Sequence, residues 1–252
     1  MHPEYEADLA ALPKIEVNPQ ANLQIAKISD EHNVVIVDNF LKEPEALVDF
    51  ACNNAADFSI PENSYPGLLR DVDEQSMADI YRFIRFVMSH QFSFLKGGIR
   101  TSTYLSMTTL QPDELQNLQR LCHTDPRERP DRRNYAGLVY LFEDAELGGT
   151  GFYRWKEQER ITEATALEAA DPERALEFLQ QHFPTYNAPA RYMTDSNEIA
   201  ELLYSIPAQF NRFVFYSGDV PHSAAIAKPE LLCDDFSRGR LTLNCFASVM
   251  PR

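Results

Sequence analysis

Strand-like runs bracket helical segments in this sequence without a regular alternation, and this order constrains the fold more than any other feature. Runs rich in β-branched and aromatic residues, the composition of strands, occur at 34–37, 100–109, 135–142, 210–216 and 240–248. Apolar residues spaced three and four apart predict a helix over 74–90, and Pro44 suits the first turn of an earlier helix. A parallel sheet requires repeated strand–helix–strand units, so the order favours an α+β fold with an antiparallel, jelly-roll-like pair of sheets.

The remaining segments are assigned from weaker patterns. Residues 1–30 are acidic and weakly patterned, which predicts an irregular lead-in, and the prolines and glycine of 58–73 predict a loop. Helical patterns over 167–182 and 197–204, with 194–196 available as caps, predict a helical insertion at about 156–206. A chain of 252 residues of this kind commonly forms one domain, so we expect a single domain over 1–252.

The charge of the chain excludes two classes of partner. With 38 acidic and 23 basic residues the formal net charge is -15, which opposes binding to nucleic acid or to an anionic membrane. The first residues lack the pattern of a signal peptide, and no run approaches the roughly 18 apolar residues of a membrane span. The four cysteines form no Cys-x-x-Cys pair. We therefore expect a soluble, cytoplasmic protein with reduced thiols.

Two short motifs nearly a hundred residues apart carry the chemistry. His123-Thr-Asp125 precedes a strand-like run, and His222 follows another after the turn 217–221. In an extended segment residues i and i+2 point to the same side, so His123 and Asp125 can face one point. Two imidazoles and one carboxylate are the ligands that hold a non-haem Fe(II) on one face and leave positions open. The motifs predict a metal site of this kind.

The same residues allow a plainer interpretation. His-x-Asp/Glu arises by chance about once in such a sequence, and His2-Pro-Glu4 is an example. Taken singly, His123 and His222 read more naturally as structural histidines. A further motif changes the balance: Arg240-Leu-Thr242 opens the last strand and offers a guanidinium and a hydroxyl on one side, suited to a carboxylate. A strand-edge salt bridge is the alternative for Arg240, and Arg238 is a weaker candidate in the same phase.

In the order of these motifs the chain resembles the 2-oxoglutarate and Fe(II)-dependent dioxygenases, particularly their prolyl-hydroxylase-like branch. The resemblance covers most of the sequence and runs through 34–40, Tyr104, His123-x-Asp125, the strand at Tyr140, Gly148-Gly149, His222 and Arg240. It implies a double-stranded β-helix, with His123, Asp125 and His222 as metal ligands. It also implies that Arg240 binds the distal carboxylate of 2-oxoglutarate, with Thr242, Tyr140 and Tyr104 as further cosubstrate residues.

The activity implied by the resemblance is hydroxylation of a small molecule or peptide, with Fe(II), 2-oxoglutarate and dioxygen consumed to give succinate and carbon dioxide. Retention of Asp125 favours hydroxylation over halogenation, since related halogenases lack the carboxylate ligand. The loop between His222 and Arg240 is longer than is common in that branch, and the helical insertion has no counterpart in the minimal fold. Both departures leave the substrate and the choice between Arg238 and Arg240 open.

The candidate substrate residues are suggested by local composition alone. Arginines crowd the loop after Asp125, and Arg127 and Arg129 there could hold an acidic group, although charge runs usually mark a solvated face. Tyr65 and Arg70 lie in a turn-rich segment that could cover a site or simply pack as an Ω-loop. Trp155, the only tryptophan, either flanks the entrance or packs the insertion.

Two other classes of function remain open on the sequence. A non-catalytic cupin-like module, or a degenerate oxygenase acting as a scaffold, would keep the sheets without needing Arg240 and all three ligands together. A zinc hydrolase would use the same ligands, but no general base stands at a recognisable spacing. The sequence does not indicate an oligomeric state.

Overall fold

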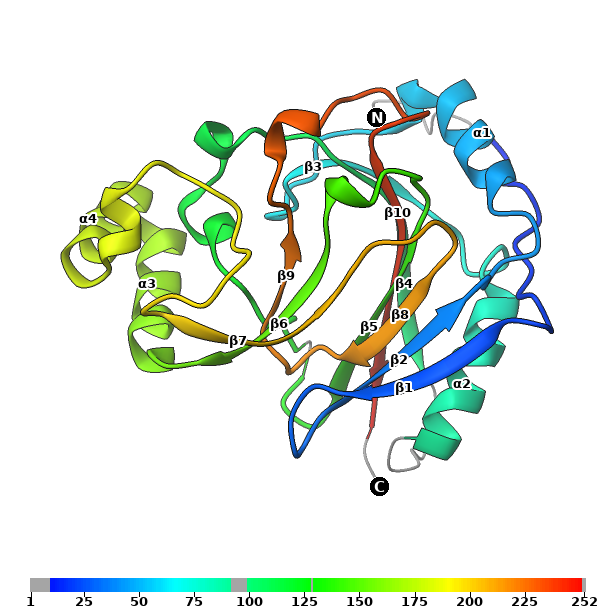
Figure 1. Ribbon diagram of the computed structural model, residues 1–252, viewed down its shortest axis with the longest axis horizontal. Coiled ribbons are helices and arrows are strands. Elements are labelled where there is room, and N and C mark those ends of the chain that lie inside the picture. The colour runs from blue at the N-terminus through cyan, green and yellow to red at the C-terminus, as the bar shows by residue number, and fades with distance from the viewer. Residues whose placement is uncertain (1–9, 92–98, 128, 251–252) are drawn as a thin grey trace, which may run out of the picture.

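A computed structural model describes residues 10–91, 99–127 and 129–250. It is an α+β structure with two antiparallel sheets (Figure 1). The larger sheet has seven strands in the order β1-β2-β8-β5-β10-β4-β3, and the smaller has three in the order β7-β6-β9. The five inner strands of this sheet are formed by the strand-like runs predicted at 34–37, 100–109, 135–142, 210–216 and 240–248.

The strands of the larger sheet are β1 (Asn22–Lys27), β2 (Asn33–Asp38), β3 (Gly67–Asp71), β4 (Arg100–Thr108), β5 (Arg133–Tyr140), β8 (Phe213–Ser217) and β10 (Arg240–Val249). Those of the smaller sheet are β6 (Gly149–Trp155), β7 (Ala200–Ile206) and β9 (His222–Ala225). The α-helices among the described residues are α1 (Glu45–Asn53), α2 (Ala78–Gln91), α3 (Gln158–Ala170) and α4 (Pro172–His182). No helix of the described ranges is long and apolar enough to cross a bilayer.

The two faces of the larger sheet bury different cores. Its outer face packs under α1 and α2 through residues such as Val35, Leu105 and Leu243. Its inner face, which includes Ile36, Tyr140 and Tyr216, packs against the smaller sheet through Phe152. Because side chains alternate along a strand, the register of the sheet assigns every polar residue to one face or the other.

The predicted helical insertion is only partly helical. Asp171 separates α3 from α4 and caps α4 by accepting hydrogen bonds from the amides of Glu173 and Arg174. The helical pattern predicted over 197–204 is wrong, since 200–206 form β7, which pairs with β6. Apolar residues spaced three and four apart fit both states in so short a run, and the sheet partner decides between them. Figure 1 places α3 and α4 on the side of the molecule opposite α1 and α2.

The strands β6 and β9 of the smaller sheet were not predicted from composition, and neither were two strands of the larger sheet. Residues 22–27, within the expected irregular lead-in, form the edge strand β1 against β2. Residues 67–71, within the expected loop 58–73, form β3 against β4. Both are edge strands, whose formation depends on a partner that the local sequence does not reveal.

Candidate metal centre

Backbone pairing brings the two histidine motifs together. His123 and Asp125 lie between the short 3-10 helix η3 (Asn117–Arg120) and β5, and His222 is the first residue of β9. The amide of each histidine donates to the carbonyl oxygen of the other, at 2.9 and 2.8 Å, and the Asp125 amide donates to the Gly218 carbonyl at 2.9 Å. These three hydrogen bonds hold the His123–Asp125 segment against the loop that leads into β9.

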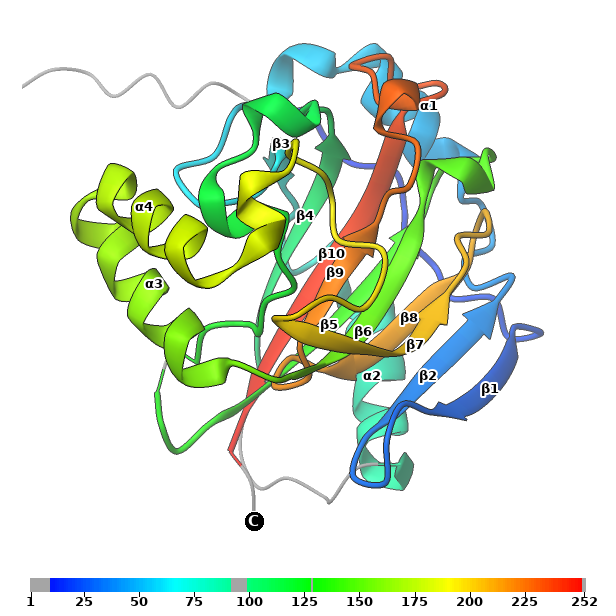
Figure 2. The same cartoon turned by 60° about the vertical axis from the view of Figure 1, so that its left-hand side comes forward.

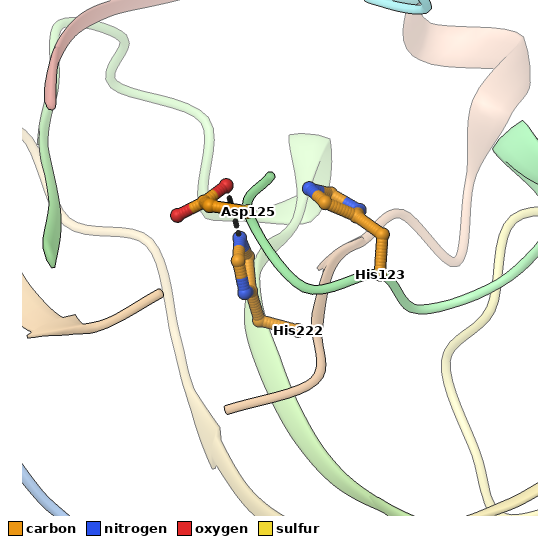
Figure 3. Close-up of side chains that lie close together, drawn as sticks. All are labelled: His123, Asp125 and His222. Atoms are coloured by element: carbon orange, nitrogen blue, oxygen red, sulfur yellow. Dashed lines mark ion pairs between the residues drawn. The ribbon is translucent and has the colours of Figure 1, made fainter. Parts of the chain in front are cut away.

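The three side chains converge on one point. One ligand atom of each of His123, Asp125 and His222 lies within 4.8 Å of the others. Nε2 of His222 is 3.7 Å from Oδ1 of Asp125, the contact drawn as a dashed line in Figure 3. The two imidazole centroids are 4.4 Å apart. This is a spacing at which one cation can contact all three.

Contacts around the cluster orient its ligand atoms. Nδ1 of His222 donates to the Val220 carbonyl oxygen at 2.9 Å, which leaves Nε2 without a proton and free to bind a metal. Oδ2 of Asp125 is buried and has no hydrogen-bond partner among the described residues. A Cβ at Gly218 would lie 2.4 Å from that oxygen, so the close approach of the loop to Asp125 requires glycine. A buried carboxylate with an unpaired oxygen is a group that a bound cation would stabilise.

The electrostatics of the cluster keep its imidazoles neutral. Burial lowers the pKa of His222 to about 4. The pKa of His123 is also lowered to about 4, first by desolvation and then by His222, although this residue keeps an exposed face. Desolvation raises the pKa of Asp125 to about 6, against the opposing influence of His123. Neutral imidazoles and a carboxylate that is costly to ionise without a partner fit a divalent cation.

Arg240 lies buried at the other end of the inner face. Its guanidinium donates to the carbonyl oxygens of Leu147, Gly148 and Gly149 at 3.1–3.2 Å and to the Thr108 hydroxyl at 3.3 Å. Within the described ranges, no carboxylate lies within 4 Å of it to form an ion pair. A buried guanidinium that contacts only neutral groups retains the capacity to bind an anion.

Hydroxyl groups surround this guanidinium. Thr108 also hydrogen-bonds the Tyr65 hydroxyl at 2.9 Å, so Tyr65 reaches the Arg240 end of the inner face from its loop. Thr242 lies opposite Tyr140 in the register, and the Tyr140 hydroxyl hydrogen-bonds Thr150 at 2.7 Å. The structure thus places Arg240, Thr242 and Tyr140 together and adds Tyr65 to them.

Tyr216 connects the Arg240 end to the histidine cluster. Its ring packs edge-on against His222 with centroids 4.8 Å apart. Its pKa is raised well above the ordinary value, first by burial and then by the charge of Asp125, while Arg240 opposes the rise. Tyr216 belongs to the inner core that also contains Phe142, and the Arg240 guanidinium lies over the Phe142 ring at 5.7 Å. The histidine cluster and the guanidinium therefore face the same interior.

The other residues named from sequence lie in different surroundings. Arg238 is exposed and pairs with Asp235 at 3.1 Å, whereas Arg240 is buried. Tyr104 is half-buried on β4, opposite Asn244, and packs against Phe246 at 6.2 Å between centroids. Trp155 ends β6 and packs against the insertion.

The arginines named as substrate candidates already have partners. Arg127 binds both carboxylate oxygens of Asp219 at 2.9 and 2.7 Å, and Arg129 binds Asp131. Arg70 pairs in the sheet with Leu105, whose side chain lies in the outer core, and its guanidinium stacks over Phe50 of α1. The structure does not bring Arg70 to the cluster.

Sequence reasoning missed Thr108, Tyr216 and Asn244 on the inner face and Gly218 in the loop beside Asp125. Two signals were available: Gly218 follows a strand directly in Ser-Gly-Asp, and Asn244 lies in phase with Arg240 and Thr242. Neither signal locates a residue without knowledge of which strands are neighbours.

Three solved structures are similar to this one at low sequence identity. A Pseudomonas putida prolyl-4-hydroxylase has 15% sequence identity and a TM-score of 0.43, with 88% of this chain and 94% of that chain covered. HygX from Streptomyces hygroscopicus, solved with nickel and 2-oxoglutarate bound, has 12% identity and a TM-score of 0.42, with 86% and 82% covered. An N-substituted L-amino acid dioxygenase from Burkholderia ambifaria AMMD has 11% identity and a TM-score of 0.34, with 87% and 83% covered.

Comparison at the level of sequence gives a family without an assigned activity. No curated protein matches the chain. A family model matches residues 19–247, which include every strand and helix described above except the last two residues of β10. The chain therefore belongs to the family of unknown function DUF6445.

Proposed function

We propose that this protein is a non-haem Fe(II) and 2-oxoglutarate-dependent oxygenase with a jelly-roll, double-stranded β-helix core, and that it hydroxylates a substrate. The overall reaction consumes 2-oxoglutarate, dioxygen and a C–H bond and yields succinate, carbon dioxide and a hydroxyl group. One observation carries the proposal: a His-Asp-His cluster and a buried arginine without a carboxylate partner among the described residues face the same interior.

The donor set fits Fe(II). His123, Asp125 and His222 would hold the ion, and two nitrogen donors with one oxygen donor leave positions open for other ligands. When bound, the iron supplies the dioxygen chemistry of the reaction. Val220 fixes the tautomer of His222, and Gly218 leaves room for the Asp125 carboxylate. These contacts hold the ligand atoms in place before the ion arrives.

The roles of the remaining residues follow from their chemistry. Arg240 would bind the distal carboxylate of 2-oxoglutarate, because a guanidinium forms charge-assisted hydrogen bonds with carboxylates. Thr108, Thr242 and Tyr65 lie beside it and offer hydroxyl groups to the same carboxylate. Burial of this end excludes water, which strengthens these hydrogen bonds. Tyr140, held by Thr150, forms part of the wall.

Anaerobic titration tests the proposal without turnover. Adding Fe(II) and 2-oxoglutarate to the purified protein should produce a weak visible absorption band from the metal-bound 2-oxo acid. Asp125→Ala should abolish the band, whereas Asp131→Ala, which changes an exposed aspartate of the same loop, should preserve it. A band that survives Asp125→Ala would overturn the assignment of the ligands.

A matched pair of variants tests whether Arg240 binds 2-oxoglutarate. Arg240→Met should abolish the band at moderate 2-oxoglutarate concentration, and Arg238→Met should not, because Arg238 is exposed and paired with Asp235. Arg240→Met also leaves three carbonyl oxygens without their donor, so circular dichroism must first establish that the variant is folded. Equal 2-oxoglutarate affinity in folded Arg240→Met and wild type would exclude Arg240 as the anchor.

A further inference from the structure

The inner face of the larger sheet changes from buried to half-exposed along β10. Arg240 and Thr242 are buried, whereas Asn244 and Phe246, which follow in the same phase, are half-exposed. Their half-exposed neighbours on β4 and β5 are Tyr104 and Leu138, each of which lies opposite Asn244 in the register. We call Tyr104, Leu138, Asn244 and Phe246 the inner-face patch.

The carboxamide of Asn244 is only half satisfied. Its Nδ2 hydrogen-bonds the Ser106 hydroxyl at 3.1 Å, and its Oδ1 is buried with no partner among the described residues. Nδ2 is therefore committed to Ser106, and the free end of the amide is the carbonyl oxygen, which accepts a hydrogen bond and cannot donate one. Leaving such a group unpaired is costly, and a ligand that pairs with it removes the cost.

The register places the patch beside the metal cluster. Phe246 lies opposite Ala136, and Ala136 lies opposite Tyr216, whose ring contacts His222. Two strand spacings, about 10 Å, therefore separate Phe246 from Tyr216. Asn244 is four residues from Arg240, which is about 13 Å along the strand. The patch is thus distinct from the arginine end and lies toward the metal cluster.

The chemistry of the patch selects an uncharged group. None of its four residues carries a charge, and the rings of Tyr104 and Phe246 meet edge to face at 6.2 Å between centroids. The loop arginines Arg127 and Arg129 are each bound to a carboxylate of the protein. A planar apolar body packs against aromatic and aliphatic side chains, and an N–H group satisfies the Asn244 carbonyl.

We infer that the inner-face patch binds the substrate that is to be hydroxylated, and that this substrate presents a neutral amide to Asn244. The inference rests on the proposed function, because it places the second substrate of that reaction. It assigns Tyr104 to this substrate rather than to the cosubstrate, since Tyr104 packs on Phe246 and lies opposite Asn244. It also predicts discrimination against a carboxylate of the same shape, which would place a negative oxygen against the Asn244 carbonyl.

Benzamide and benzoate are matched probes, since they share a ring and a planar head group and differ in charge and in the N–H donor. Their binding is followed by ligand-observed NMR with Mn(II) added to the protein. Mn(II) bound by His123, Asp125 and His222 broadens the signals of a probe that binds beside it, and Zn(II) serves as the diamagnetic control. Electron paramagnetic resonance of the same sample reports whether Mn(II) is bound.

The expected result is that benzamide signals broaden and that benzoate binds at least about fivefold more weakly, a difference of one hydrogen bond. Asn244→Leu should remove this preference, and Asn187→Leu, the same change at an exposed residue near α4, should retain it. Asn244→Leu should also unfold at the same or a higher temperature, because it removes an unpaired polar group. A purely structural Asn244 would instead give a destabilised variant.

Equal binding of the two probes, or a preference that survives Asn244→Leu, would overturn the inference. If wild-type protein binds Mn(II) but benzamide is not broadened, the inference alone fails and the metal assignment stands. If wild-type protein does not bind Mn(II), the proposed function fails with it. The two failures are therefore separate observations on one sample.

Discussion

His123 and His222 exchange backbone hydrogen bonds, each amide donating to the carbonyl oxygen of the other at 2.9 and 2.8 Å. The spacing of the two imidazoles is therefore set by main-chain pairing rather than by a bound ion. Residues far apart in sequence are held by the same kind of contact that joins strands, and the ligand cluster is part of the fold. A cation that binds there finds its ligands already assembled.

This preorganisation predicts that a divalent metal stabilises the protein. An ion present at a hundred times its dissociation constant adds about 2.7 kcal/mol to the free energy of unfolding. In a chain of this size that raises the melting temperature by about 5–10 °C, which differential scanning fluorimetry with Mn(II) measures directly. His222→Ala should lose the shift, and His90→Ala, at an exposed helix end, should keep it. A full shift in His222→Ala would mean that the metal binds elsewhere.

Asp125 should reduce the stability of the metal-free protein at neutral pH. The pKa of its carboxyl is raised by burial from 3.8 to about 6, so the folded state holds a proton that the unfolded state has released. The resulting contribution to stability is present below about pH 4, is lost as the pH rises through 6, and becomes a constant penalty above that. Asp125→Asn should therefore stabilise the metal-free protein at pH 8, by up to about 3 kcal/mol.

Urea unfolding of metal-free protein at pH 8 and pH 4 measures this difference. The gain from Asp125→Asn should be present at pH 8 and small at pH 4, while Asp131→Asn, at an exposed position, changes little at either pH. The same Asp125→Asn protein should bind Mn(II) much more weakly. Loss of stability at pH 8 would show that the charged form of Asp125 is favoured by contacts within the protein.

The five inner strands of the larger sheet are predictable from sequence, and its two edge strands and the smaller sheet are not. The segments that become β2, β4, β5, β8 and β10 are rich in β-branched and aromatic residues, because both faces of the central strands are buried. The segments of β1, β3 and β7 take strand conformation from a neighbour. Nothing local distinguishes them from an irregular segment, a loop and a helix, respectively.

The candidate site likewise contains some residues that the sequence alone identifies and others that only the strand pairing reveals. His123, Asp125, His222 and Arg240 are visible in the sequence because their residue types and order carry chemistry on their own. Tyr216 and Asn244 become visible only through the register that aligns β8, β5 and β10. Arg70 shows the converse, since its loop suggested a covering role and the alternation of β3 turns it to the outer core. Which face a side chain takes depends on strand pairing, which the local sequence does not encode.

Gly218 should be required for metal binding although it offers no ligand. A Cβ at this position would lie 2.4 Å from Oδ2 of Asp125 and 2.9 Å from its Cβ, so the carboxylate must move or the loop must retreat. We expect Gly218→Ala to weaken Mn(II) binding at least about tenfold, a loss typical of outer contacts to metal ligands. Ser217→Ala, next to it, is the control. Isothermal titration with unchanged Mn(II) affinity in Gly218→Ala would show that the loop adapts.

Tyr65 should contribute to 2-oxoglutarate binding through its hydroxyl. The hydroxyl shares Thr108 with the Arg240 guanidinium, at 2.9 and 3.3 Å, so a carboxylate on Arg240 lies within its reach. Tyr65→Phe should weaken anaerobic binding of 2-oxoglutarate about tenfold, the contribution of a hydrogen bond to a charged group. It should not weaken binding of 2-oxopentanoate, which has the same 2-oxo acid head and no distal carboxylate. Tyr192→Phe is the matched control, because the Tyr192 hydroxyl is committed to the Leu110 carbonyl at 2.7 Å. Equal weakening of both ligands by Tyr65→Phe would instead indicate that its loop acts on the whole site, and an unchanged 2-oxoglutarate affinity would place the carboxylate out of reach of Tyr65.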